Sequence, residues 1–361
     1  MNKLCTLTDI DLGIFMMHWK KRYMPDGINT AKAKTNRLLV ITICLPVFSL
    51  LFFTGCSREQ EAVDLYVDAI ILTKLDEDEL AIEKLNSAVR LNKRFYPAYS
   101  LLGEIYQEIK DYKKSASAYE KATELNTLSF KDFFNLGRVY QILREFAPAV
   151  KAYVKACELP PQSPYAHLYP KVHLHAAESY FELKDYDKAL VYAQQAGQMD
   201  PNLSEVQKLL GDIYDSRRDY EQAIRSYKRS LEIDANDPNV MGSLAIAYLN
   251  AGRYEPPKEL LADVVRIQPG NNTAHRYLGY CYLQLNEVDR AIESYNRAIA
   301  INDKDWQAFR GLGVAYMFKL LSSKDESLKA KAVQHWRISL AINPNQDRRE
   351  RLMQWIRKYS K

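Results

Sequence analysis

The sequence predicts an all-α solenoid, in which helical hairpins stack one after another. Three observations support this prediction. A glycine followed three residues later by a tyrosine recurs with a period of 34 residues, as at Gly103 and Gly137. Other large and small residues are spaced four apart, so they share one helical face, and prolines near the ends of several periods would stop a helix there. A fixed period of this length is typical of stacked helical pairs, which bury their apolar faces against their neighbours.

The unit that begins at Asn272 illustrates the expected hairpin. Its small residues would let two helices approach closely, and its large residues would fill the space around them. The small residues are Gly279, Ala291 and Ala298, and the large ones are Leu278, Tyr282 and Tyr295. We therefore expect Gly279 and Ala291 to lie where the two helices cross.

Eight such units can be placed over residues 62–346. The unit starts are Ala62, Tyr96, Phe130, Pro170, Ser204, Pro238, Asn272 and Trp306. Successive starts are 34 residues apart, except for a spacing of 40 before Pro170. The inserted segment, residues 163–169, is expected to form a tolerated loop between units. The alternative is that this loop bends the array or contacts a partner.

Acidic residues stand before the second helix of several units, at Asp111, Glu145, Asp185 and Asp219. A carboxylate at this position can cap the helix and favours its positive end. In the sixth unit, Pro256 is tolerable only if it falls in the first turn of the second helix.

These residues resemble the tetratricopeptide repeat (TPR) family, and the resemblance covers residues 62–346. It implies a right-handed superhelix in which the first helix of each unit lines a concave groove, and it implies a protein or peptide ligand. Some family members hold a chaperone's terminal carboxylate with a clamp that includes an asparagine. At the corresponding positions this chain has Asp212 in the fifth unit and Tyr280 in the seventh, so the clamp is not present.

Residues 1–55 are interpreted as a leader, with Met24 as an alternative start. Three basic residues precede an apolar run over residues 38–53, and Thr54, Gly55 and Cys56 follow it. This arrangement resembles a bacterial lipoprotein signal that ends in a lipobox. The resemblance implies that the thiol of Cys56 receives a lipid and that cleavage removes the leader.

An uncleaved transmembrane anchor is the alternative interpretation. The apolar run is shorter than the ~20 residues that cross a bilayer as a helix, and its charges precede it, which favours the lipoprotein. Residues 56–61 would then form a tether, and the repeats would face the periplasm. Ser57, as a residue other than aspartate, favours the outer membrane by the sorting rule of enteric bacteria.

Composition and motifs argue against nucleic-acid binding and catalysis. The net charge is +5, of which residues 1–55 carry +4, so the rest lacks a concentrated basic face. The histidines between residues 167 and 175 lack a metal-binding spacing, and phosphate-loop and nucleophile motifs are absent. Cys157 and Cys281 lie too far apart in a solenoid to pair. We predict no enzyme activity, cofactor, metal or small-molecule substrate.

The candidate partner-binding surface is the rear part of the groove, on the first helices of units 6 to 8. Its residues are Ile246, Leu249, Arg276, Tyr280, Leu283, Arg310, Val314, Met317 and Phe318. The front part is acid-rich, with Glu178 and Glu182 among its residues. A contiguous apolar patch usually marks a binding surface, so we expect an extended ligand to bury apolar side chains there. Arg276 and Arg310 are expected to face the ligand and to pair with an acidic group on it, without a role in packing.

Residues 347–361 are predicted to form a last helix that caps the apolar edge of unit 8, with a basic patch for acidic lipid as the alternative. The sequence thus predicts a membrane-anchored scaffold for protein–protein interactions outside the cytoplasm. Envelope assembly, pilus biogenesis and polysaccharide export are all compatible with it. The alternative is an accessory subunit that presents substrates to an enzyme.

Overall fold

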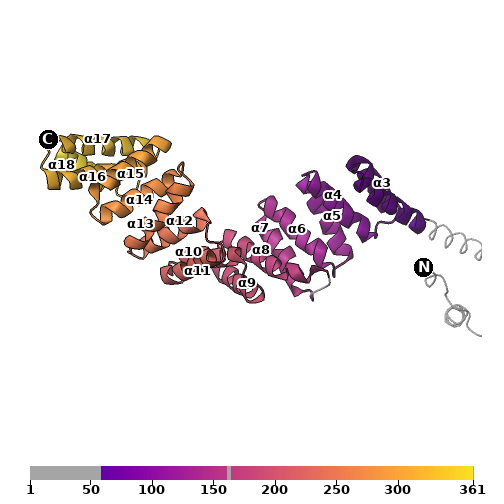
Figure 1. Ribbon diagram of the computed structural model, residues 1–361. Helices are drawn as coiled ribbons and strands as arrows, with labels where there is room; N and C mark the ends of the chain where they lie inside the picture. Colours follow the sequence, from indigo (N-terminus) through magenta and orange to yellow (C-terminus); the bar gives the residue numbers. More distant parts are fainter. Residues whose placement is uncertain (1–57, 161–163, 361) are drawn as a thin grey trace, which may run out of the picture. The chain divides into compact units, whose positions relative to one another are not determined.

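The computed structural model describes residues 58–160 and 164–360 (Figure 1). These residues form helices joined by short turns, and no β-strand occurs among them, so the chain is all-α as predicted. Within the same ranges, no helix is both long and apolar enough to cross a membrane. The predicted leader and Cys56 lie outside the described residues.

The chain divides into two compact units, residues 1–98 and residues 99–361. In the described part of the first unit, a helix over residues 58–73 precedes α3 (Asp78–Leu91). Small side chains on both helices, such as Ala69 and Ala88, are fully buried. Across them, Nζ of Lys84 lies 3.4 Å from Oδ2 of Asp68.

The second unit is a run of helices that starts with α4, whose first residues belong to the first unit. Its helices are α4 (Tyr96–Glu108), α5 (Tyr112–Leu125), α6 (Phe130–Ile142), α7 (Phe146–Glu158), η1 (Tyr165–Leu168), α8 (Tyr169–Glu182), α9 (Tyr186–Met199), α10 (Ser204–Ser216), α11 (Tyr220–Ile233), α12 (Pro238–Asn250), α13 (Glu255–Ile267), α14 (Asn272–Gln284), α15 (Val288–Ile301), α16 (Trp306–Ser323), α17 (Ser327–Ile342) and α18 (Arg349–Tyr359). From α6 onward, α6 packs on α7, α8 on α9, and so on to α16 on α17. Each second helix then contacts the first helix of the next pair, which is the order of contacts in a solenoid.

Short acidic side chains begin several of the second helices. The carboxylates of Asp111, Asp185 and Asp219 each accept a hydrogen bond from the backbone N–H three residues later, at 3.3 Å. Glu145 makes no such bond, so the predicted hydrogen-bonded cap is wrong there. The difference fits the preference of this position for short side chains such as aspartate.

Glycines in the first helices make room for aromatic rings of the second helices. A β-carbon on Gly211 would lie 2.4 Å from Cε1 of Tyr227, closer than packed atoms approach. Equivalent contacts join Gly103 to Tyr119, Gly137 to Tyr153 and, at a looser 3.1 Å, Gly279 to Tyr295. The helices therefore cross at these glycines, as the small-residue pattern predicts.

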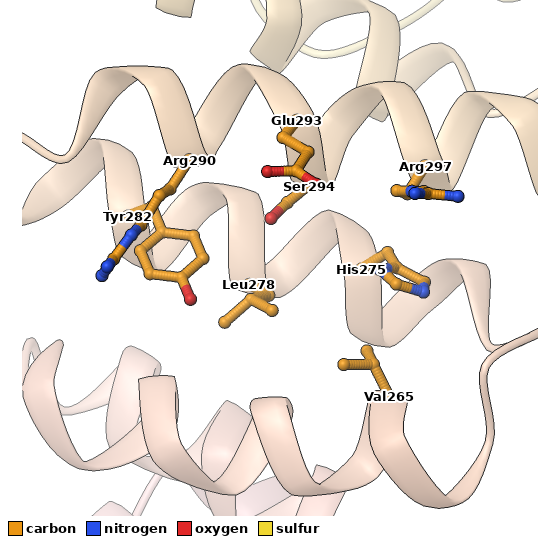
Figure 2. Close-up of a pocket in the computed structure, with 8 residues that line it drawn as sticks. All are labelled: Val265, His275, Leu278, Tyr282, Arg290, Glu293, Ser294 and Arg297. Carbon is orange, nitrogen blue, oxygen red and sulfur yellow. The ribbon is translucent and has the colours of Figure 1, made fainter.

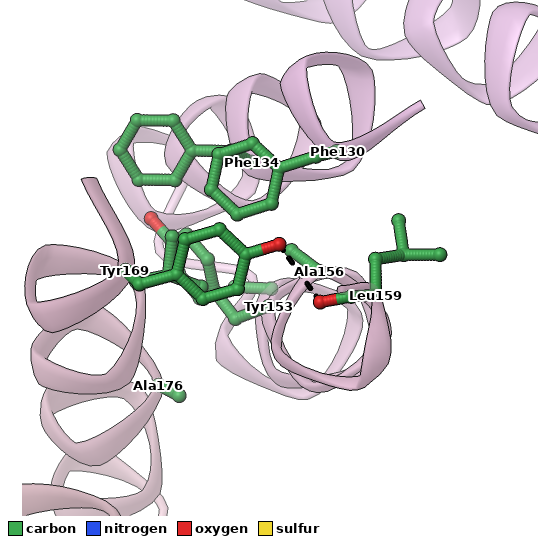
Figure 3. Packing of buried hydrophobic residues seen from close by; sticks show 9 residues of the cluster. Phe130, Phe134, Tyr153, Ala156, Leu159, Tyr169 and Ala176 are labelled. Carbon is green, nitrogen blue, oxygen red and sulfur yellow. Dashed lines mark hydrogen bonds between the residues drawn. The ribbon is translucent and has the colours of Figure 1, made fainter. Parts of the chain in front are cut away.

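The inserted segment packs into the core instead of forming an open loop. Residues Tyr165–Leu168 form η1, and the ring of Tyr169 stacks on Phe130 with centroids 4.6 Å apart (Figure 3). The hydroxyl of Tyr169 donates to the carbonyl oxygens of Leu159 and Pro160, at 2.8 and 2.7 Å. The loop prediction is therefore wrong for Tyr169, which begins α8 with its side chain buried and hydrogen-bonded, while Tyr165 packs half-buried against Phe130. Ser163 lies outside the described residues.

Helix α18 covers the end of the array. Leu352 is buried, and the ring of Trp355 packs 5.4 Å from that of Trp336, which is itself 1% exposed. Trp336 also fills the space beside Gly313, as the tyrosines do in earlier units. The last helix thus caps the apolar edge of the final hairpin, as predicted.

A histidine lies within this last hairpin. The imidazole of His335 in α17 stacks between Phe309 and Tyr316 of α16, with centroids 5.9 and 5.5 Å away. Its Nδ1 is buried and has no hydrogen-bond partner among the described residues. Burial lowers the pKa of His335 from its ordinary value of 6.5.

His335 should make the stability of the array depend on pH. The unfolded chain binds a proton at this ring more readily than the folded chain does, because the folded pKa is the lower one. The free energy of unfolding should therefore fall as the pH drops below about 6.5, toward the folded pKa. Urea denaturation between about pH 8 and about pH 5 measures this slope. A His335→Phe variant keeps the stacked ring and should lose part of the slope, whereas an unchanged slope would contradict the assignment.

A candidate partner-binding surface

The first helices of the last hairpins form a continuous layer, in which α12 contacts α14 and α14 contacts α16. The predicted groove residues lie on these three helices. Tyr280 on α14 and Phe318 on α16 are exposed, at 38% and 44%. Ile246, Leu249, Val314 and Met317 are half-buried. The layer thus presents two exposed aromatic rings with partly exposed aliphatic side chains on the same helices.

Tyr280 is held by a neighbour from the start of the preceding unit's second helix. The ring of Tyr254, in the turn before α13, meets Tyr280 edge-on with centroids 6.1 Å apart. Burial, and next the nearby Tyr254, raise the pKa of Tyr280. The phenol therefore stays neutral, and the pair offers a ring surface of the kind that anchors protein interfaces. Tyr254 was not among the predicted groove residues because it stands at the start of a second helix, at the unit position of Tyr112, Tyr186 and Tyr220, and not on a first helix.

Leu283 does not belong to this surface. Its side chain is 6% exposed and packs in the core cluster with Ala291 and Tyr295. The prediction is wrong here: it placed Leu283 on the correct helix, but the side chain faces the core and not the groove. Without Leu283, the candidate surface consists of the exposed and half-buried residues.

Arg276 is also not available to a ligand. Its Nη1 lies 2.8 Å from Oδ2 of Asp305, a carboxylate whose side chain is only 2% exposed. Asp305 also accepts hydrogen bonds from Asn272 and from the backbone N–H of Ala308, which it caps at the start of α16. Arg276 is therefore a structural link between units 7 and 8. The expectation that it has no role in packing is wrong, because Asp305, which caps the first helix of the next unit, places a buried carboxylate within its reach.

Arg310 occupies the same position one unit later and reaches forward in the same way. Its Nη1 donates to the carbonyl oxygen of Asp347 at 3.2 Å and lies 3.4 Å from Oε1 of Gln346, while its guanidinium lies 4.9 Å from the Trp306 ring centroid. Burial, and next the charge of Arg348, lower the pKa of Arg310. Unlike Arg276, Arg310 has no carboxylate partner among the described residues. Arg310 thus forms no ion pair among the described residues, although the charge of nearby Asp347 acts on its guanidinium.

The charges in the front part of the layer largely neutralise one another. Nζ of Lys131 lies 2.6 Å from Oε1 of Glu104, and Lys208 pairs with Asp212 at 2.8 Å. Burial acts to raise the pKa of Glu178, but hydrogen bonds and charge from His175 outweigh it, so the net pKa is lowered. The front part is therefore a paired polar surface, which contrasts with the exposed rings of the rear part.

Residues 58–160 and 164–360 contain no assembled catalytic or metal-binding site. No cluster of three His, Cys, Asp or Glu is placed there to hold a metal ion. His173 is buried with its Nδ1 2.8 Å from the carbonyl oxygen of Tyr169, whereas His175 contacts Glu178. Cys157 and Cys281 are both free, and burial raises the pKa of each to about 12, which keeps them as thiols.

A separate pocket of about 260 Å³ lies on another face of α14 (Figure 2). It is lined by Val265, His275, Leu278, Tyr282, Arg290, Glu293, Ser294 and Arg297. Nη1 of Arg290 lies 2.7 Å from Oε2 of Glu287, which is not one of the residues that line the pocket. In the sequence, this pocket corresponds to a row of polar residues on α15, Arg290, Glu293 and Arg297, at i, i+3 and i+7. Such a row is equally typical of a solvent-exposed helix face, so the pocket was not predicted.

The order of hairpins and the layer of first helices define the chain as a helical-repeat array. Residues 71–311 match the family model described as the C-terminal domain of cilia and flagella-associated protein 70, a TPR domain. The chain therefore belongs to this TPR family. As a TPR array, it is a scaffold for protein–protein interaction.

Curated relatives are similar over shorter stretches. Anaphase-promoting complex subunit 3 of Schizosaccharomyces pombe is 23% identical over 121 residues, which are 34% of this chain and 18% of that protein. Human tetratricopeptide repeat protein 7B is 30% identical over 105 residues, 29% of this chain and 12% of that protein. Human protein O-mannosyl-transferase TMTC1 is 22% identical over 161 residues, 45% of this chain and 17% of that protein. The chain thus spans less than a fifth of the length of each of these relatives.

One solved structure shows the same fold. The C-terminal part of a TPR repeat-containing protein from Cytophaga hutchinsonii superimposes with a TM-score of 0.56 at 13% identity, over 70% of this chain and 98% of that one. A tetratricopeptide repeat protein from Parabacteroides merdae has a TM-score of 0.49 at 15% identity, over 74% and 99%.

Proposed function

We propose that this protein is a lipid-anchored TPR scaffold of the bacterial cell envelope, which holds a protein partner against the first helices of its last three hairpins. The exposed pair of rings, Tyr280 and Phe318, carries the proposal for the binding surface. Large exposed aromatic side chains with aliphatic neighbours are typical anchors of protein interfaces. The charge of Arg310, which forms no ion pair among the described residues, would favour a partner with an acidic group near its apolar anchors.

The anchor is proposed from the sequence that surrounds Cys56. The apolar run and the Thr54-Gly55-Cys56 motif support lipidation, and Ser57 favours the outer membrane. The scaffold would then act in envelope assembly, pilus biogenesis or polysaccharide export. Metabolic labelling with a fatty-acid probe tests the anchor: the label should disappear in Cys56→Ala. A label that Cys56→Ala leaves intact would rule this part out and would leave the binding surface untouched.

The binding surface is tested by crosslinking the protein in its native membrane and measuring the recovered partner. Tyr280→Ser with Phe318→Ser should lower the recovery about tenfold, because two anchors of the interface are removed. The fold should be unchanged, since both side chains are exposed.

The matched control removes two exposed apolar side chains from the front part of the same layer. Ile142 and Leu183 are 47% and 45% exposed, at the ends of α6 and α8. Ile142→Ser with Leu183→Ser should leave recovery close to that of the unmodified protein. If the control pair abolishes recovery and the rear pair does not, the surface has been placed in the wrong part of the array.

A further inference from the structure

The first described helix carries a stripe of exposed apolar side chains. Val63, Val67 and Ile71 are spaced four residues apart on the helix over residues 58–73, so they lie along one face. Their side chains are 39%, 47% and 52% exposed. Leu75 and Leu80, in and just after the turn that follows, are 62% and 49% exposed. We call Val63, Val67, Ile71, Leu75 and Leu80 the N-terminal stripe.

Single exposed apolar residues are ordinary in a folded protein, but a row of them on one helix is not. The opposite face of the same helix is buried through Ala62 and Ala69, which are 0% exposed. The helix thus already packs on its own hairpin, and the N-terminal stripe is a second apolar face. A helix that is apolar on two faces normally packs between two neighbours.

The two ends of the repeat array differ in this respect. At the C-terminal end, α18 packs its Leu352 and Trp355 against Trp336, so the apolar edge of the last hairpin is covered. Repeat arrays require a polar outer face on their terminal units to remain soluble. The first hairpin lacks such a face, since no described residue removes the N-terminal stripe from solvent. The N-terminal stripe is therefore an apolar face that the described residues leave uncovered.

Acidic side chains border the N-terminal stripe and indicate the charge of a partner that would bind there. Glu61, Asp64 and Asp68 lie along one flank of the stripe at i, i+3 and i+7, and all three are exposed. Eight acidic and two basic residues lie between residues 58 and 79. Of the three flanking carboxylates, only Asp68 has an ion pair among the described residues, with Lys84. The stripe is therefore an apolar row with an acidic border.

We propose that the N-terminal stripe docks a basic amphipathic helix of another protein. That helix would lay an apolar face along Val63, Val67 and Ile71, as helices pack through residues three and four apart. Its lysines or arginines would face Glu61 and Asp64, and charge complementarity would set its direction and its partner choice. This docking site lies on the first hairpin and is independent of the binding surface proposed on the last three.

The acidic border disfavours the other occupants. An anionic membrane surface would be repelled by the excess of carboxylates, whereas surface-bound amphipathic helices carry basic polar faces. A second copy of this chain would bring an identical acidic border against the first, and like charges across an interface are unfavourable. A basic helix is the occupant that satisfies both the apolar row and the charge.

Synthetic helical peptides provide the test on the purified full chain. One peptide has a leucine face flanked by lysines, and a second has the same face flanked by glutamates. Fluorescence anisotropy should show binding of the lysine peptide and weak or no binding of the glutamate peptide. Val67→Ser with Ile71→Ser should weaken binding of the lysine peptide about tenfold.

Charge exchange sharpens the test. Glu61→Lys with Asp64→Lys should weaken binding of the lysine peptide and strengthen binding of the glutamate peptide. Non-specific hydrophobic binding would not produce this inversion. Val191 and Met199, exposed by 51% and 49% on α9, give a matched control, and Val191→Ser with Met199→Ser should change neither affinity. Circular dichroism should show the same helicity in all variants, since every altered side chain is exposed.

Other outcomes would overturn the proposal. One is equal binding of both peptides, unaffected by Val67→Ser with Ile71→Ser. A second is dimerisation of the chain that the same variant abolishes, and a third is flotation with anionic lipid vesicles that it abolishes. A fourth is a photo-crosslinker at Ile71 that reacts only with residues 1–57 of its own chain.

Discussion

Arg276→Leu should lower the free energy of unfolding by about 3–5 kcal/mol. The cause is the carboxylate of Asp305, which is 2% exposed and loses its cationic partner at 2.8 Å. The hydrogen bonds from Asn272 and Ala308 remain, but both donors are neutral and cannot balance the negative charge of Asp305. Urea denaturation measures the loss, and hydrogen exchange should locate it at the boundary between α14 and α16.

Two controls separate burial from the ion pair itself. Arg266 pairs with Asp263 at the same 2.8 Å, but both side chains are exposed, so Arg266→Leu should change stability by less than about 0.5 kcal/mol. Adding Asp305→Asn to Arg276→Leu should recover part of the loss, because the amide can still cap α16 without a charge. Equal stability of the Arg276 and Arg266 variants would contradict the structural role of Arg276.

Gly211→Ala should destabilise the protein by about 1–3 kcal/mol, although alanine is the better helix former. The new β-carbon would lie 2.4 Å from Cε1 of Tyr227. The ring has little freedom to retreat, because its hydroxyl donates to Oδ1 of Asp212 at 2.7 Å. The crossing of α10 and α11 must then open, and the change in urea midpoint measures the cost.

Gly242 on α12 gives the matched control. A β-carbon there would meet no atom within 4 Å. Gly242→Ala should therefore stabilise the protein by about 0.5–1 kcal/mol, through helix propensity alone. If both alanine variants shift stability in the same direction, the close helix crossing at Gly211 has been misassigned.

The repeat period allowed most of the fold to be predicted. Each helix pair buries its apolar face against the next, so the same packing problem recurs at the same spacing. This is why the spacing of small and large residues was enough to place Gly279 at a helix crossing. The insertion before α8 fell outside the period, and the stacking of Tyr169 on Phe130 was accordingly missed.

The candidate site was harder to predict, because a position within the unit identifies a helical face but not its neighbours. Arg276 lies at a groove position, yet Asp305, the cap of the next unit's first helix, removes it from the groove. Leu283 was placed on the wrong side of α14 for the same reason. Tyr254 precedes a second helix, whereas the groove was predicted from the first helices, and Arg348 lies beyond the last unit, where the period gives no register. Tyr280 and Phe318 are exposed as predicted, although Tyr254 of the preceding unit packs edge-on against the Tyr280 ring.

Hydrogen–deuterium exchange on the protein alone and in its copurified complex tests the central claim most directly, namely that the last three hairpins hold a protein partner. The account predicts that the partner slows exchange in α14 and α16, around Tyr280 and Phe318. It predicts no comparable protection in α6 and α8, where Lys131 and Glu178 are already paired with Glu104 and His175. Protection confined to α6 and α8, with α14 and α16 unchanged, would contradict the account.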